Sequence, residues 1–272
     1  MEKYSVLMSL YSKEKPNQLV LSIDSMINQS IPPDEIVIVE DGELTDELYK
    51  IVDTYTRNHP KLFTIVKNNQ NLGLGLSLNN GLFAARNNLV ARMDTDDISK
   101  NDRCEKQLKV FEINKELSIV GSWVDEFAEN TDSILSTRKV PEKTDEIYKF
   151  SKRRSAFNHP AVMYKKASVL ECGGYNDLKR NQDVDLFGRM MFAGYKAYNI
   201  QESLLLFRTN IELAKRRKSW VNTKSYLKVI RNFWKMGFSS FWDFFIVSIA
   251  QIVMFLMPAR MQNWFYRIFL RK

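Results

Sequence analysis

Strand-like and helix-like segments alternate along the first hundred residues, and this alternation limits the choice of fold more than any other feature of the sequence. Short apolar runs predict strands over residues 5–11, 36–39, 63–66 and 89–93. Apolar residues at helical spacing predict helices between them, over residues 16–29, 45–58 and 76–85. This order predicts an α/β fold in which a parallel sheet carries helices on its faces.

The pattern weakens in the second half of the chain. A helix over 102–114 and a strand over 119–127 continue the alternation, which then stops in a polar stretch at 129–145. Further along there is an apolar run at 159–164, and we expect a helix over 183–193. The regular part of the fold is therefore predicted most firmly for the first half.

Charge divides the chain near residue 205. Residues 205–272 contain 13 Lys or Arg and two acidic residues, whereas the first 204 residues have a net charge of −3. The same segment holds four of the five tryptophans. We predict a main domain over 1–205 and a basic, aromatic-rich helical extension over 206–272. Such an extension suits an anionic surface, either lipid headgroups or nucleic acid.

Composition excludes several classes of protein. With 44% hydrophobic and 26% charged residues, the chain is neither disordered nor of low complexity. Two cysteines are too few for a disulfide framework or a four-thiolate zinc site. The N-terminal segment has charges and no long apolar run, so we expect no secretory signal and reduced thiols in the cytoplasm.

Carboxylates gather where two predicted strands end. Asp41 follows one strand, and the sequence Asp94-Thr95-Asp96-Asp97 follows another. Ligands of an open parallel sheet bind outside the carboxyl ends of its strands. Three carboxylates so close together repel one another unless a cation lies among them, and oxygen ligands of this kind suit Mg²⁺ or Mn²⁺. The alternative interpretation is a solvated acidic turn.

A third acidic signal is the sequence NQDVDL at 181–186, at the predicted start of a helix. Asp183 would lie in the first turn, where the helix dipole favours a carboxylate. It either stabilises the helix start or acts as a general base toward an acceptor hydroxyl. His159, before an apolar run, either is structural or faces the site. The loop over 69–75 lacks the third glycine of a Rossmann motif, and no Walker A sequence occurs.

In their order, these segments resemble the family 2 glycosyltransferases, which are inverting enzymes with a GT-A fold. The resemblance covers residues 4–210 and rests on a set of short motifs: SVLMSLY, Glu40-Asp41-Gly42, Asn71-Leu-Gly73, ARMDTDD, His159-Pro160, Gly173-Gly174-Tyr175 and QDVDL. ARMDTDD together with VPEKTDEIYKF and NHPAVM looks most like the amylovoran-biosynthesis type, which builds capsule, exopolysaccharide and O-antigen repeats. It implies a Rossmann-like, mostly parallel central sheet with flanking helices.

The resemblance also implies residue roles. Residues 1–100 would form the nucleotide-binding half and 101–205 the acceptor half. The residues expected to bind the nucleotide are Tyr11, Asp41, Asn71, Arg92 and Asp94. Asp94 and Asp96 would hold Mn²⁺ (or Mg²⁺), Asp183 would be the general base, and His159, Arg216 and Arg217 would meet the acceptor or its diphosphate. Leu78, Gln182 and Asn210 depart from residues that are common in the family.

The reaction implied is transfer of one hexose, galactose before glucose, from a UDP-sugar to a lipid-diphosphate-linked sugar. We expect a β-1,3 linkage to N-acetylhexosamine-diphospho-undecaprenol. Two alternatives are a sugar-nucleotide pyrophosphorylase-like enzyme and a non-enzymatic basic protein that binds nucleic acid or membrane. The first usually has a Gly-rich loop after its opening strand, which SLYSKEKP lacks. The acidic strand ends would repel nucleic-acid phosphates, so we expect no nucleic-acid partner.

The extension contains an apolar run, FFIVSIAQIVMFLM, at residues 244–257. It is shorter than the roughly 20 residues that a spanning helix needs. We predict an interfacial element, with the basic residues of 215–235 toward anionic headgroups and Trp234, Trp242 and Trp264 at the boundary. The alternative is a core helix or one packed in a homodimer. These features predict peripheral attachment to the cytoplasmic face of the bacterial inner membrane.

Overall fold

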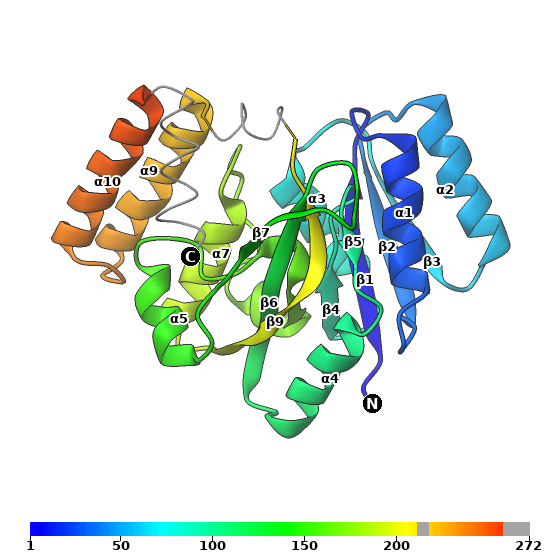
Figure 1. Cartoon of the computed structure of the whole chain (residues 1–272), viewed down its shortest axis with the longest axis horizontal. Coiled ribbons are helices and arrows are strands. Elements are labelled where there is room, and N and C mark those ends of the chain that lie inside the picture. Colours follow the sequence, from blue (N-terminus) through cyan, green and yellow to red (C-terminus); the bar gives the residue numbers. More distant parts are fainter. Residues whose placement is uncertain (211–217, 258–272) are drawn as a thin grey trace.

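One nine-stranded sheet with helices on both faces forms the body of the molecule (Figure 1). The computed structural model describes residues 1–210 and 218–257. The strands are β1 (Tyr4–Leu10), β2 (Glu35–Asp41), β3 (Phe63–Asn68), β4 (Leu89–Arg92), β5 (Ile98–Ser99), β6 (Leu117–Phe127), β7 (Ile134–Arg138), β8 (Met163–Lys165) and β9 (Lys196–Arg208). The helices are α1 (Pro16–Ile27), α2 (Asp46–Asn58), α3 (Leu74–Ala84), α4 (Arg103–Ile113), α5 (Thr144–Ser151), α6 (Lys166–Glu171), α7 (Gln182–Phe192), α9 (Trp220–Lys235) and α10 (Phe241–Leu256).

The strand order is β3-β2-β1-β4-β8-β6-β9-β5, and β7 pairs with β6. The pairs β3–β2, β2–β1 and β1–β4 are parallel, which confirms the α/β prediction. Beyond β4 the sheet is mixed rather than mostly parallel, because β8 runs antiparallel to both β4 and β6. Between β7 and β8 the chain passes through α5 and the short 3₁₀ turn at His159–Ala161.

The predicted elements of the first half all occur, with ends shifted by a few residues. The sequence analysis missed β9, in which exposed polar residues interrupt the apolar pattern. It also missed β7, α5 and α6. Strand β9 pairs in parallel with β6 as far as Arg208, so the compositional boundary at residue 205 falls inside a strand of the main sheet.

Alternate residues of the parallel strands enter two separate cores. Leu7, Val37 and Val39 point to the face covered by α3 and α7, while their neighbours Met8 and Ile38 point to the face covered by α1, α2 and α4. This division follows from the side-chain period of two in a strand. All five side chains are fully buried, so both faces of the strands are closed, as parallel sheets require.

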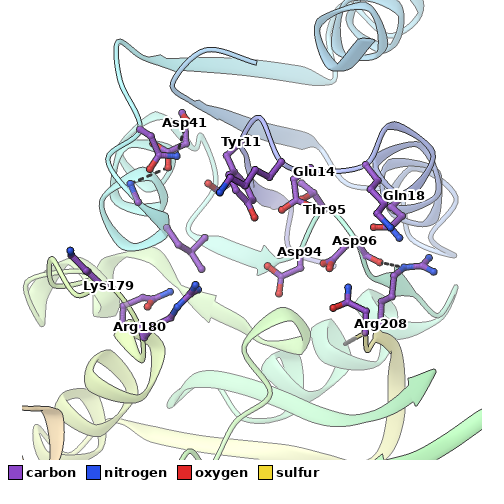
Figure 2. A pocket seen from close by; sticks show the side chains of 18 of the residues that line it. Tyr11, Glu14, Gln18, Asp41, Asp94, Thr95, Asp96, Lys179, Arg180 and Arg208 are labelled. Carbon is purple, nitrogen blue, oxygen red and sulfur yellow. Dashed lines mark hydrogen bonds between the residues drawn. The ribbon is translucent and has the colours of Figure 1, made fainter. Parts of the chain in front are cut away.

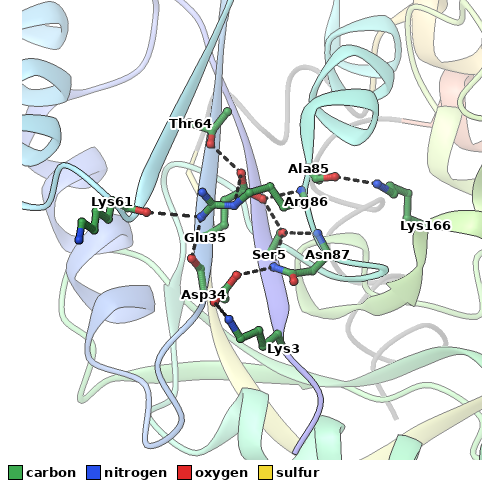
Figure 3. A network of polar contacts seen from close by, with 10 residues as sticks. All are labelled: Lys3, Ser5, Asp34, Glu35, Lys61, Thr64, Ala85, Arg86, Asn87 and Lys166. Carbon is green, nitrogen blue, oxygen red and sulfur yellow. Dashed lines mark hydrogen bonds and ion pairs between the residues drawn. The ribbon is translucent and has the colours of Figure 1, made fainter.

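A buried carboxylate joins the amino ends of the parallel strands (Figure 3). Glu35, at the start of β2, is 0% exposed. Its Oε2 accepts hydrogen bonds from Ser5 Oγ at 2.6 Å and from the Arg86 backbone N–H at 2.8 Å. Its Oε1 accepts from Thr64 Oγ1 at 2.6 Å and lies 3.4 Å from Arg86 Nε. One side chain thus ties β1, β2, β3 and the end of α3 together.

Helices α9 and α10 lie side by side at one end of the molecule (Figure 1). Helix α9 packs on α7, where a Cβ added at Gly188 would lie 2.0 Å from Phe233 Cζ. Helix α10 packs on α9 and leaves many of its apolar side chains exposed. Among the residues that the structure describes, no helix combines the length and apolar character needed to cross a membrane.

Candidate active site

The parallel strands end in an open cleft with a volume of about 510 Å³. From β1 the chain goes to β2 and β3 on one side, and it then returns to form β4 on the other side of β1. Open α/β sheets bind ligands at the point where the strand order reverses in this way. The cleft is lined by residues after β1, β2 and β4 and by the segment before α7 (Figure 2). They include Tyr11, Asp41, Asn71, Asp94 and Asp96, five of the predicted site residues.

Asp41 organises the loop on one side of the cleft. Its Oδ1 accepts a hydrogen bond from Leu72 N at 2.7 Å, and its Oδ2 accepts one from Gly73 N at 3.0 Å. Asn71 Nδ2 in turn donates to the Asp41 carbonyl oxygen at 3.2 Å. Asp41 and Asn71, far apart in the sequence, therefore form one wall of the cleft.

Three carboxylates from the DTDD sequence converge at the end of β4. One oxygen from each of Asp94, Asp96 and Asp97 lies within 4.8 Å of the others. Burial and repulsion from Asp96 and Asp94 hold the pKa of Asp97 well above its usual value. Asp97 Oδ1 accepts from Arg208 N at 2.8 Å, whereas its buried Oδ2 has no hydrogen-bond partner among the described residues. An unpartnered carboxylate oxygen beside two others fits a divalent cation, since a cation would satisfy it and relieve the repulsion.

Arg92 lies beneath this cluster. Its side chain is 1% exposed, and its Nη2 contacts Asp94 Oδ1 at 2.5 Å. Burial opposes the charge, but interactions with Asp94, Tyr175 and Tyr164 together raise the pKa of Arg92, so the guanidinium stays charged. Arg92 does not line the cleft and acts on it through Asp94, which it orients from behind.

Arg208, at the end of β9, is a site residue that sequence reasoning did not find. Its Nε donates to the Asp96 carbonyl oxygen at 2.8 Å (Figure 2). Its guanidinium stacks on the Phe127 ring, 4.5 Å from the ring centroid. These contacts hold the acidic turn against β9 and bring the positively charged guanidinium of Arg208 into the cleft. The signal was the basic residue that ends the apolar run LLLF, but the run had not been recognised as a strand.

Asp183 is the second residue of α7, so the predicted helix start is confirmed. Burial raises the pKa of Asp183, and repulsion from Asp94 adds to the increase, while backbone N–H groups of the first turn lower it. The two carboxylates are thus close enough to interact. Asp183 itself is not among the described residues that line the cleft, whereas the preceding residue, Gln182, is. A partly exposed carboxylate with a raised pKa is suited to accept a proton.

His159 lies in a largely buried cluster of rings. Its Nε2 is 2.9 Å from Tyr175 Oη, and its ring contacts Phe187. Burial and the nearby charge of Arg92 hold the pKa of His159 well below its usual value, so the ring is neutral. His159 does not line the cleft. The predicted residues Arg216 and Arg217 lie outside the described residues.

Four basic residues that the sequence analysis did not single out do line the cleft: Lys13, Lys15, Lys179 and Arg180. Lys179 and Arg180 lie at the opposite end of the cleft from Arg208 (Figure 2). Positively charged side chains on both sides of an acidic cluster suit a ligand that carries several phosphate oxygens. Gln182 and Asn210, which depart from the family pattern, also line the cleft, whereas Leu78 is buried in the core.

This arrangement agrees with comparisons of the whole chain. The model of the family described as "Glycosyl transferase family 2" matches residues 5–172. The chain belongs to family 2 of the glycosyltransferases. It is therefore a glycosyltransferase, and not the pyrophosphorylase-like enzyme or the non-enzymatic binding protein that the sequence analysis kept as alternatives.

Two family members from bacteria match over almost their full length. One, from Escherichia coli, is named UDP-Gal:alpha-D-GlcNAc-diphosphoundecaprenol beta-1,3-galactosyltransferase and is 36% identical, covering 99% of this chain and 97% of the relative. The other is the amylovoran biosynthesis glycosyltransferase AmsE of Erwinia amylovora, 32% identical with 97% of both chains covered. The resemblance to the amylovoran type is thereby confirmed.

Solved structures of other glycosyltransferases share the GT-A fold. A mannosyltransferase from Pyrobaculum calidifontis, solved with GDP-Man and Mn²⁺, has a TM-score of 0.64 at 14% identity, covering 97% of this chain and 79% of that one. TarS 1-349 of S. aureus, solved with UDP-GlcNAc, has a TM-score of 0.61 at 17% identity, covering 98% and 73%. The GT-A prediction is therefore confirmed.

Proposed function

We propose that this enzyme transfers galactose from UDP-galactose, with inversion, to an N-acetylhexosamine carried on undecaprenyl diphosphate. The observation that carries the proposal is that three carboxylates cluster at the edge of the cleft, and that one of them, Asp94, interacts electrostatically with the separate aspartate Asp183. The name of the Escherichia coli relative supports the donor, the acceptor and the β-1,3 linkage. The name of AmsE supports a place in the assembly of a surface polysaccharide.

The nucleoside part of the donor would bind between β1 and β2. Tyr11 and the wall formed by Asp41 and Asn71 line that part of the cleft and offer an aromatic ring and amide groups. Lys179 and Arg180 offer charge to the phosphates from the α7 side. The acceptor diphosphate would then meet the basic residues at the rim of the same cleft.

Asp94, Asp96 and Asp97 would hold Mn²⁺ (or Mg²⁺). When bound, the ion acts as a Lewis acid that neutralises charge on the leaving diphosphate. Arg92 orients Asp94 for this role, and Arg208 holds the backbone of the acidic turn. Titration with Mn²⁺ followed by calorimetry tests the site: we expect binding by the full chain and none by the Asp96→Asn, Asp97→Asn variant. Equal binding by both proteins would refute the assignment.

Asp183 would be the base. Its carboxylate takes the proton from the attacking hydroxyl while the oxygen forms a bond to C1 of galactose. The bond from C1 to the phosphate oxygen breaks on the opposite side, and UDP leaves with the electron pair. One displacement from the opposite face converts an α-linked donor into a β-linked product.

Replacement of Asp183 by Asn tests this role. We expect kcat to fall by about 10²–10⁴-fold, which is the contribution of general base catalysis. Binding of UDP should not change, because the nucleotide contacts lie elsewhere in the cleft. Asp177→Asn, at an exposed position of the same connecting segment, is the matched control. The assay uses UDP-galactose, UDP-glucose and a synthetic lipid-diphosphate acceptor, with NMR of the product. Normal turnover by Asp183→Asn would remove it from the role.

We also propose that the α9–α10 pair attaches the enzyme to the cytoplasmic face of the inner membrane. One face of α10 exposes a continuous apolar stripe: Trp242, Phe245, Ile246, Ile249, Val253 and Leu256. One face of α9 exposes four bases at helical spacing: Lys224, Lys228, Arg231 and Lys235. An apolar stripe together with a basic stripe suits an anionic bilayer, where each basic residue contributes about 1 kcal/mol to the binding free energy.

Flotation with phosphatidylglycerol vesicles tests the attachment. The variant Ile246→Glu, Ile249→Glu should remain unbound, while Ile113→Glu, at an isoleucine that is 86% exposed on the far side of the fold, should bind normally. Binding by both variants would contradict the proposal. Loss of a dimer in the first variant, with no vesicle binding by the unmodified chain, would favour a dimer interface on the same face.

A further inference from the structure

The connection that leads into α7 has an unusual backbone. Asn181, the residue before α7, has φ +60°, and it is the only non-glycine residue with a positive φ among residues 1–210 and 218–257. The left-handed region costs an L-residue about 1–2 kcal/mol, although Asn tolerates it better than most. Asp183 follows two residues later, so the direction of its side chain depends on this turn. Such a conformation persists only where the surrounding structure holds it.

Helix α9 supplies that support from the C-terminal part of the chain. Asn181 Nδ2 donates to both the carbonyl oxygen and Oδ1 of Asn222, each at 3.3 Å. Ser225 Oγ, one helical turn along, donates to the carbonyl oxygen of Arg180. Ser225 is buried, so this contact is shielded from water. The two residues before α7 are therefore both held by α9.

The rest of α7 is fixed independently of these contacts. Asp185 accepts hydrogen bonds from Asn176 Nδ2 at 2.8 Å and from Arg189 Nε at 2.9 Å. Arg189 also donates to the carbonyl oxygen of Gly174 at 2.6 Å. Loss of the contacts with Asn222 and Ser225 should therefore release the turn at 180–181 without unfolding α7.

We propose that Asn222 and Ser225 of α9 are positioning residues for Asp183. The proposal rests on the proposed function, because it takes Asp183 as the base. It makes the C-terminal extension part of the catalytic machinery, in addition to any role at a membrane.

The experiment compares the full-length double variant Asn222→Ala, Ser225→Ala with two controls. Asn222→Asp keeps the acceptor oxygen for Asn181 and should rescue activity when Ser225 is intact. Asn232→Ala removes an exposed amide from the same helix and should have no effect. For each protein we would measure kcat, KM for UDP-galactose, UDP affinity, the melting temperature and hydrogen exchange of the amides of residues 182–185.

We expect kcat of the double variant to fall about 10- to 100-fold, as for a misplacement of a catalytic group by about 1 Å. UDP affinity should fall less than kcat, because Arg180 lies in the released turn but is only one of the basic residues that line the cleft. Exchange at 182–185 should become faster. An unchanged kcat would overturn the proposal. A parallel loss of UDP affinity, kcat and melting temperature would also overturn it, since that pattern indicates a purely structural role.

The result is separable from the test of Asp183 itself. If Asp183→Asn keeps normal turnover, the assignment of the base fails, and with it the proposed role of α9 in positioning that base. Faster exchange at 182–185 in the double variant would then still report that α9 holds the turn. If Asp183→Asn is inactive and the double variant is fully active, only the positioning proposal fails.

Discussion

Replacement of Glu35 by Ala should lower stability strongly without changing the active site. Glu35 accepts three hydrogen bonds of 2.6–2.8 Å and is fully buried at the amino ends of the strands. The cleft lies at the opposite, carboxyl ends. The variant therefore separates what holds the sheet together from what performs the chemistry.

The magnitude follows from the partners that Glu35 would leave behind. Ser5 Oγ also contacts Asn87 Nδ2 at 3.1 Å, and Thr64 is partly exposed, so both can form other hydrogen bonds. The Arg86 backbone N–H loses its acceptor, which costs about 1–3 kcal/mol. Hydrogen bonds to a charged group contribute about 1.5–3 kcal/mol each, so we expect a total of about 3–5 kcal/mol.

Urea unfolding followed by circular dichroism gives the free energy directly. Because each kcal/mol lowers the melting temperature of a domain of this size by about 2–4 °C, a decrease of about 10 °C is expected. Glu112→Ala, at an exposed glutamate of α4, is the control and should change the free energy by less than about 0.5 kcal/mol. A loss below about 1 kcal/mol for Glu35→Ala would refute the reasoning, because hydrogen bonds of this kind would then contribute almost nothing.

Two further predictions concern the cleft. Burial raises the pKa of Asp183, and a general base must be ionised to act. We therefore expect kcat to decrease as the pH falls, with a midpoint above the ordinary aspartate pKa of 3.8. A midpoint at or below pH 3.8 would contradict this prediction. Gly42→Ala should weaken UDP binding about tenfold by calorimetry, because φ is +84° and a Cβ would lie 2.7 Å from Asn71 N. Gly173→Ala is the control: its backbone strain is similar, at φ +82°, but an added Cβ would have no atom within 4 Å, so UDP affinity should stay unchanged. Equal losses of UDP affinity in both variants would contradict the proposed wall of the cleft.

The sequence was sufficient where function depends on residues that directly follow a regular element. Asp41 and Asp94 come after apolar strands, and the carboxyl ends of parallel strands share one edge. The period-two and helical patterns of the first half locate those ends to within a few residues. For the same reason, the helix start at Asp183 could be predicted from NQDVDL alone.

The sequence was not sufficient for contacts between distant segments. Arg208 meets the acidic turn because β9 pairs with β5, which directly follows that turn, and with β6. The polar residues within β9 hid that strand from the sequence analysis. Asn222 meets Asn181 only because Phe233 fits against Gly188 and brings α9 onto α7. Composition alone suggested that the basic C-terminal segment was a separate extension.

What the chain determines by itself is the α/β pattern and the chemistry available at its strand ends, because both depend on local spacing. Tertiary packing alone decided which side chains surround that chemistry. Hydrogen bonds between residues that lie 41 to 112 positions apart hold the turns at 94–97 and 180–181. No local pattern encodes such contacts, since they form only when whole helices and strands have packed together.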